Sequence, residues 1–179
     1  MMILRLTILF VLASFMSGCS FVKSVNKLGE EPYTANENEW KGTWIVDDNS
    51  IQIKVINHKL GEIEIMFIEA GKLLKNRIFL TQNGSETYLN LVEKPEDKFY
   101  YPAKFKKSKN QLIVWSVSSD ALKKAIRDKK IDGEITKHKY SDDLLIKASK
   151  EELNNFFVRN REQMLFDYEE PLVLRRLVK

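Results

Sequence analysis

The sequence predicts a mainly β domain with some helix (α+β), an antiparallel meander that forms a small barrel or sandwich with two helices in the C-terminal half. From Trp40 onward, apolar and polar residues alternate with a period of two, and turn-forming clusters separate the runs, as in consecutive antiparallel strands. Asn83-Gly84 is the strongest hairpin signal, because both residues tolerate a positive φ. After Ser118 the apolar spacing becomes that of amphipathic helices.

The meander is expected to contain about seven short strands, each bounded by a turn signal. Ile51, Ile53 and Val55 form the apolar side of one run, and later runs repeat this alternation. The clearest expected strands cover 51–55, 63–67, 77–81, 88–92, 100–105, 112–117 and 172–178. Closing such a meander into a barrel removes its exposed edges.

Two helices interrupt the strands. The first is capped by Ser119 or Asp120 and runs to Lys130. Strand 143–148 follows, with a further candidate strand at 134–139. Ser149 and Glu152 form a capping box for a second helix, which is expected to reach about residue 165. Its buried side is predicted to contain Leu153, Phe156, Phe157, Arg161 and either Met164 or Leu165.

The N-terminus has the layout of an export signal. A short segment with one basic residue, Arg5, precedes an apolar run over 6–15, which is too short to span a bilayer as a helix of about 20 residues. The run Phe15-Met16-Ser17-Gly18-Cys19 resembles the lipobox of bacterial lipoproteins. This resemblance implies cleavage before Cys19 and acylation of its thiol, so that lipid chains anchor the protein to a membrane. The alternative is that Cys19 is a small apolar residue of an ordinary signal peptide.

The predicted organisation has three parts: a signal peptide (1–18), a lipidated N-terminus with a flexible tether (19–39), and a single β-rich domain (40–179). A tether of that length has an end-to-end distance of roughly 25 Å. Because Ser20 is not aspartate, the lipoprotein resemblance implies the outer membrane and its periplasmic face. Cys19 is the only cysteine, so no disulfide is expected.

Composition indicates an ordinary globular domain. The chain has 29 basic and 25 acidic residues, and 44% of its residues are hydrophobic. The modest net charge of +4 and the expected envelope location give no support to nucleic-acid binding. Two local basic stretches, 104–109 and 123–130, are candidates for contact with anionic headgroups or an acidic partner, or are simply a soluble exterior.

Gly42-Thr43-Trp44, at the start of the first strand, resembles the Gly-x-Trp signature of lipocalins and other calycin-type barrels. The resemblance implies that Trp44 packs across the closed end of a barrel against an arginine near the last strand. Arg175 is the predicted partner, and Arg176 is the alternative. Otherwise, Trp44 is an ordinary aromatic residue of the core.

The sequence gives little support to catalysis. His58 and His138 each lie beside lysines and are expected on the surface, and no His or Cys cluster has metal-ligand spacing. Carboxylate pairs such as Glu62 and Glu64 alternate with apolar residues and are expected on a solvated strand face. We therefore expect no enzyme, cofactor or metal site.

Binding is the expected function. Tyr101, Phe105 and Trp115 are candidates to line a pocket for a small hydrophobic ligand, with core packing as the alternative role. The competing hypothesis is a protein-interaction module of the cell envelope, acting as an assembly accessory or an inhibitor. The lipid on Cys19 would supply the membrane contact in either case.

Overall fold

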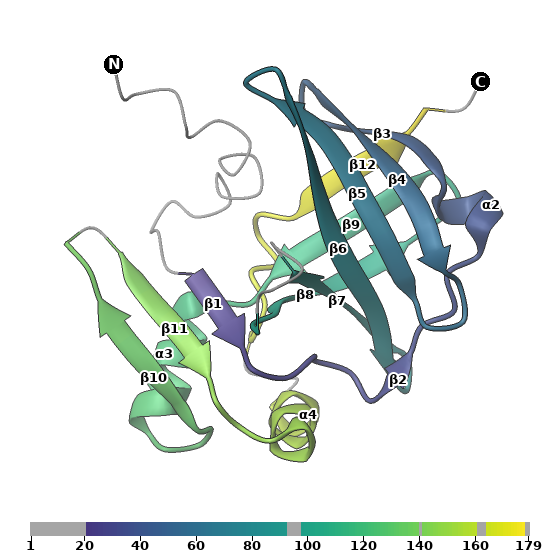
Figure 1. Cartoon of the computed structure of the whole chain (residues 1–179). Coiled ribbons are helices and arrows are strands. Elements are labelled where there is room, and N and C mark those ends of the chain that lie inside the picture. The colour runs from purple at the N-terminus through teal and green to yellow at the C-terminus, as the bar shows by residue number, and fades with distance from the viewer. Residues whose placement is uncertain (1–20, 93–97, 140, 161–163, 178–179) are drawn as a thin grey trace.

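The computed structural model describes residues 21–92, 98–139, 141–160 and 164–177 (Figure 1). Within this part of the chain, eight antiparallel strands form a closed meander barrel, which confirms the predicted fold class. Each strand pairs with the next, and the last strand closes the barrel by pairing with both β9 and β3. The barrel strands are β3 (Gly42–Val46), β4 (Asn49–Asn57), β5 (Glu62–Glu69), β6 (Lys72–Asn83), β7 (Glu86–Val92), β8 (Tyr101–Lys107), β9 (Gln111–Ser116) and β12 (Leu172–Arg176).

The alternation that predicted the strands is also the alternation of burial. In β5, Ile63, Ile65 and Phe67 are buried, while the residues between them are partly exposed. A strand places successive side chains on opposite faces, so this pattern directs one apolar set into the barrel. The predicted hairpin at Asn83-Gly84 joins β6 to β7, and Gly84 has a φ of +60°.

Residues 21–39 are part of the fold, and the expected flexible tether is wrong for them. β1 (Phe21–Ser24) pairs with β11 (Asp142–Ile146), β2 (Glu31–Pro32) pairs with β6, and α2 (Glu37–Trp40) precedes β3. Leu28 and Ala35 are fully buried. The sequence suggested a tether because the segment lacks a regular apolar periodicity, and the partners that hold its backbone, β11, β6 and Asn90, lie far away in the chain.

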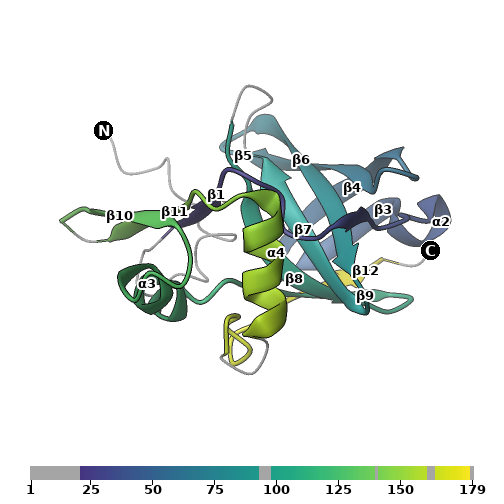
Figure 2. The ribbon, with the colours of Figure 1, turned by 90° about the horizontal axis from the view of Figure 1, so that it is seen from below.

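The second sheet has three strands and stands beside the barrel. β10 (Gly133–Lys137) pairs antiparallel with β11, and β1 pairs with β11 in parallel. α4 (Lys150–Arg159) lies between this small sheet and the barrel, while α3 (Ser119–Arg127) packs on the small sheet (Figure 2). All these elements except β1 come from the connection between β9 and β12.

The two C-terminal helices are confirmed, but the second is shorter than predicted. The capping box of Ser149 and Glu152 is present, and the predicted apolar side is buried at Leu153, Phe156 and Phe157. The helix ends at Arg159, and Asn160 caps it: its backbone N–H (3.1 Å) and its side-chain amide (2.8 Å) both donate to the Phe156 carbonyl. The predicted buried position of Arg161 lies outside the described residues, and Met164 is exposed while Leu165 is buried.

The described residues form two apolar cores. One lies inside the barrel and includes Trp40, Trp44 and Phe105. The other lies between the outer face of β7 to β9, α4 and the small sheet, and includes Tyr88, Phe157 and Phe166. Among the described helices, none has the length and apolar character to cross a membrane.

Candidate functional site

Large aromatic side chains occupy the end of the barrel that carries α2. Trp40, Trp44 and Phe105 are each at most 2% exposed. The ring centres of Trp40 and Phe105 are 5.6 Å apart, and that of Tyr33 is 5.4 Å from Phe105. The side chain of Lys107 also points into this end, 5.6 Å from the Trp40 ring, and its ammonium lies 3.3 Å from the Glu39 carboxylate. This end is packed with side chains.

The arginine opposite Trp44 in the β12–β3 ladder is Arg176, so the predicted pairing with Arg175 is wrong. Arg176 donates to the backbone carbonyls of Asn38 (2.7 Å) and Lys41 (2.5 Å), which ties α2 to the last strand. Arg175 is opposite Ile45 and is exposed. A shift of one residue along a strand moves the side chain to the other face, and this is why the choice between adjacent arginines failed.

The glycine of the Gly-x-Trp motif has a specific backbone role. Gly42 has a φ of +134°, a conformation that L side chains rarely adopt. It is the first residue of β3 and follows the end of α2 by two positions, where the chain turns into the barrel wall. Two residues later, the indole N–H of Trp44 donates to the Trp40 carbonyl (2.9 Å), so the motif fixes the position of α2 relative to β3.

The predicted ligand pocket of Tyr101, Phe105 and Trp115 does not form. Phe105 faces Val114 across the β8–β9 ladder and belongs to the core inside the barrel. Trp115 faces Lys104 in the same ladder and packs against the core outside the barrel. The barrel wall separates the two rings because their positions differ by one step of the strand alternation.

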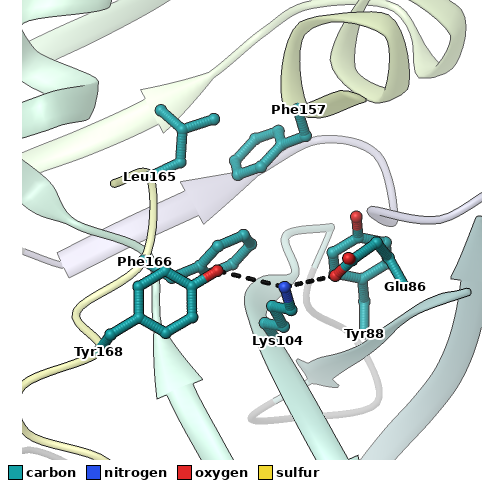
Figure 3. Close-up of a pocket in the computed structure, with 7 residues that line it drawn as sticks. All are labelled: Glu86, Tyr88, Lys104, Phe157, Leu165, Phe166 and Tyr168. Atoms are coloured by element: carbon teal, nitrogen blue, oxygen red, sulfur yellow. Dashed lines mark hydrogen bonds and ion pairs between the residues drawn. The ribbon is translucent and has the colours of Figure 1, made fainter. Parts of the chain in front are cut away.

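A surface hollow of about 100 Å³ lies outside the barrel, around Lys104 (Figure 3). We call it the Lys104 hollow. β7 and β8 form one wall, while α4 and the segment that returns to β12 form the other. Its lining combines one cation and one carboxylate with apolar and aromatic side chains, namely Glu86, Tyr88, Lys104, Phe157, Leu165, Phe166 and Tyr168.

Backbone hydrogen bonds hold both walls of the Lys104 hollow. Tyr88 and Lys104 are direct partners in the β7–β8 ladder. On the other side, Ser118 N–H donates to the Leu165 carbonyl (2.9 Å), and Asp167 N–H donates to the Ser116 carbonyl (3.0 Å). Segment 165–168 is therefore attached to the end of β9 although it has no regular secondary structure.

The aromatic rings of the hollow form a connected set. Phe166 lies 6.2 Å from Tyr88 and 5.5 Å from Phe157, measured between ring centres. Tyr168 lies 6.3 Å from Phe166 and 5.6 Å from Trp115. The Lys104 ammonium is within 6 Å of the Phe166 and Tyr168 ring centres, close enough for cation–π attraction.

The Lys104 ammonium is fixed by two hydrogen bonds. Its Nζ donates to the Glu86 carboxylate and to the Tyr168 hydroxyl (3.1 Å), as Figure 3 shows. Burial disfavours the charged form, but the bonds to Glu86 and Tyr168 outweigh this effect and raise the pKa of Lys104 above 10.5. A lysine acting as a base or nucleophile at neutral pH needs a lowered pKa instead. The arrangement is suited to binding rather than to proton transfer.

A second, open hollow of about 290 Å³ lies on the outer face of β3 and β12. Its lining is Ile45, Asp47, Val173 and Arg175. It lacks aromatic walls, and both Asp47 and Arg175 are exposed. We therefore regard the Lys104 hollow as the better candidate for recognition.

The histidines and the basic stretch 104–109 are not organised as sites. His58 and His138 are exposed, and His138 Nε2 is 3.7 Å from Asp143. The described residues contain no group of three His, Cys, Asp or Glu that could hold a metal. The stretch 104–109 does not form one surface patch, because Lys104 lies in the hollow and Lys107 points into the barrel.

The predicted lipidation residue, Cys19, lies outside the described residues. Comparisons with protein-family models, curated proteins and solved structures give no significant match.

The Lys104 hollow was missed because its residues come from four separate segments. The one available signal was the position of Lys104 on the outward face of β8, next to aromatic Trp115.

Proposed function

We propose that this chain is a bacterial lipoprotein that is anchored through acylated Cys19 and carries a non-catalytic binding domain. The lipobox-like run before Cys19 supports the anchor and favours the periplasmic face of the outer membrane. The eight-stranded meander, the positive φ of Gly42 and the Trp44–Arg176 ladder pair support a calycin-like barrel. Acyl chains on one cysteine would hold the domain stably at the membrane.

The ligand of this domain is an envelope protein that inserts one aromatic or apolar side chain into the Lys104 hollow. The observation that carries this proposal is the set of connected rings around a fixed cation. Pockets for small molecules usually measure roughly 300–1,000 Å³, whereas this hollow measures about 100 Å³. The smaller volume fits a single side chain, and interface hot spots are enriched in aromatic anchors that fill such pockets.

A small hydrophobic ligand inside the barrel is less well supported. Trp40, Trp44 and Phe105 occupy the α2 end of the barrel interior. The expected pocket residues Phe105 and Trp115 do not meet, because they lie on opposite faces of the barrel wall. Native mass spectrometry of the chain purified from residue 21 onward tests this alternative. A stoichiometric apolar molecule that copurifies would favour the ligand function over protein binding.

Site-specific photocrosslinking in intact cells tests the protein-binding function. A photoreactive phenylalanine analogue replaces Glu169, an exposed residue next to Tyr168 that leaves the Tyr168 hydroxyl bound to Lys104, and in a matched control it replaces Leu60, which is 54% exposed between β4 and β5. We expect one discrete adduct from position 169 and none from position 60. The adduct should disappear when Phe157→Ala is added, because this change removes one aromatic wall. The proposal is wrong if position 169 gives no adduct or if both positions capture the same proteins.

The anchor has its own test. Cys19→Ser in the full chain should leave unprocessed precursor and abolish acyl labelling, because no other cysteine is present. Normal cleavage of this variant with unchanged labelling would contradict lipidation at Cys19.

A further inference from the structure

The neighbouring strands β3, β12 and β9 are apolar on both faces. Their inward residues belong to the core inside the barrel. Their outward residues include Ile45, Val173 and Ile113, which are partly exposed. An antiparallel strand with a solvated outer face carries polar residues there, as β5 does at Glu62 and Glu64. Apolar residues on the outer face of three adjacent strands therefore indicate a surface that another molecule covers.

The three outward residues form a continuous apolar row. Val173 is opposite Ile113 in the β12–β9 ladder, and Ile45 lies on β3, the other neighbour of β12. Paired strands are about 5 Å apart, so side chains that leave the same face of neighbouring strands lie next to each other. None of the three residues belongs to either core that the described residues form.

Two opposite charges lie beside this row. Asp47 follows Ile45 by two positions and Arg175 follows Val173 by two positions, and all four residues line the open hollow of about 290 Å³. Since β3 and β12 are antiparallel and Ile45 is opposite Arg175, the apolar pair occupies one diagonal of the hollow and the charged pair occupies the other. Both charged side chains are exposed, and within the described part of the chain neither has an ion pair or a hydrogen bond.

This pattern of charge and apolar surface is complementary to itself. A twofold axis along the apolar diagonal brings Ile45 and Val173 of one copy against the same residues of a second copy. The same rotation exchanges the two ends of the charged diagonal, so that Arg175 of each copy faces Asp47 of the other. A guanidinium and a carboxylate form two parallel hydrogen bonds. Two such ion pairs would flank an apolar centre.

We propose that the outer face of β3 and β12 is a self-association surface, on which a second copy of this chain binds around a twofold axis with reciprocal Arg175–Asp47 ion pairs. The four residues of this surface do not line the Lys104 hollow. The inference therefore stands independently of the proposed partner of that hollow and of the proposed lipid anchor.

Cysteine crosslinking of the full chain in intact bacterial cells tests the surface. Val173→Cys places a thiol beside the proposed axis, and a short bismaleimide should then give a covalent homodimer on a denaturing gel. A reagent with a spacer is used because packed sheets lie about 10 Å apart. Lys75→Cys is the matched control, since Lys75 is exposed on β6, on the opposite side of the barrel from β12, and should give no homodimer. The chain without an added cysteine reveals any reaction through Cys19, its only native cysteine.

Charge exchange in the Val173→Cys chain tests the ion pairs. Asp47→Arg or Arg175→Asp alone places like charges face to face, and we expect the homodimer yield to fall about tenfold. The double variant restores both pairs with reversed polarity and should recover the original yield. Position 47 has a φ of +49°, and the single and double variants carry the same arginine there, so the recovery cannot come from the backbone.

Three results would overturn the proposal. The first is no homodimer from Val173→Cys, or as much homodimer from Lys75→Cys. The second is an adduct of Val173→Cys with a different protein only, which would assign this surface to another partner. The third is a double variant whose yield stays as low as that of the single variants.

Discussion

Asn90 and Leu28 form a reciprocal hydrogen-bonded pair across the outer wall of the barrel. The Leu28 N–H donates to Asn90 Oδ1 (2.7 Å), and Asn90 Nδ2 donates to the Leu28 carbonyl (3.0 Å) and to the Thr81 hydroxyl oxygen (3.0 Å). Asn90 and Leu28 are both fully buried. One amide therefore satisfies both backbone groups of a residue that lies in no strand or helix, and it docks the N-terminal segment on β7.

Replacing Asn90 with leucine should destabilise the protein strongly. The change leaves the buried N–H of Leu28 without its partner, while the Leu28 carbonyl keeps only the hydrogen bond from the Thr81 hydroxyl, so we expect the free energy of unfolding to fall by about 3 kcal/mol. Urea denaturation followed by circular dichroism measures this. Asn155→Leu, at an exposed position of α4, is the matched control and should change the stability by no more than about 0.5 kcal/mol. Equal effects of the two changes would contradict the docking role of Asn90.

A chain that begins at Trp40 should not fold like a chain that begins at Phe21. The shorter chain lacks β1 and β2, and it lacks buried Leu28 and Ala35. β11 would also lose its parallel partner, leaving an unpaired edge. We expect the longer chain to show a cooperative thermal transition and the shorter chain to show a broad one or none. Matching midpoints would show that residues 21–39 contribute no stability.

Arg176 and Arg175 should differ in their effect on stability although they are adjacent. Arg176→Ala removes two charged hydrogen bonds to the backbone around α2, and we expect a loss of about 2 kcal/mol. Arg175→Ala changes an exposed side chain and should cost less than about 0.5 kcal/mol. The comparison uses chemical denaturation at neutral pH. A larger effect at Arg175 would contradict the role of Arg176 in attaching α2 to β12.

Lys104 should make stability depend on pH in the alkaline range. Its folded pKa is raised above 10.5 because hydrogen bonds to Glu86 and Tyr168 outweigh the effect of burial. Because the folded pKa is raised, the charged form of Lys104 stabilises the folded state fully below the unfolded pKa, and this stabilisation is lost as the pH rises through the folded pKa. The difference in unfolding free energy between the wild type and Lys104→Met should therefore be constant below about pH 10 and shrink as the pH rises further. A constant difference would contradict the role of the charged form.

The barrel could be predicted because its strands alternate regularly. In the β5 run, the alternation of Ile63, Ile65 and Phe67 with more polar residues predicts both the strand and its buried face. The capping box at Ser149 and Glu152 was equally local, and it fixed the start of α4 correctly. These features depend on neighbours in the chain, so a single sequence contains the necessary information.

The N-terminal segment and the candidate site depend on distant partners. Leu28 is held by Asn90, 62 positions away. The Lys104 hollow joins β7, β8, α4 and the segment around Tyr168, and the order of residues in the chain does not show that these meet. Phe105 and Trp115 were assigned to one pocket because their strand faces were not compared, and the β8–β9 register separates them.

The ladders of the first and last strands also constrain the order of folding. Phe21 pairs with Asp143 in the small sheet, and Trp44 pairs with Arg176 in the barrel. Both sheets therefore need residues from the final quarter of the chain before they are complete. Contacts of such long sequence separation carry a high loop-closure entropy and slow folding. Until the last strand is synthesised, β3 is an unpaired edge. We therefore expect chaperones that bind unpaired strands to have more time to bind at β3 than at strands whose partners follow directly in the chain.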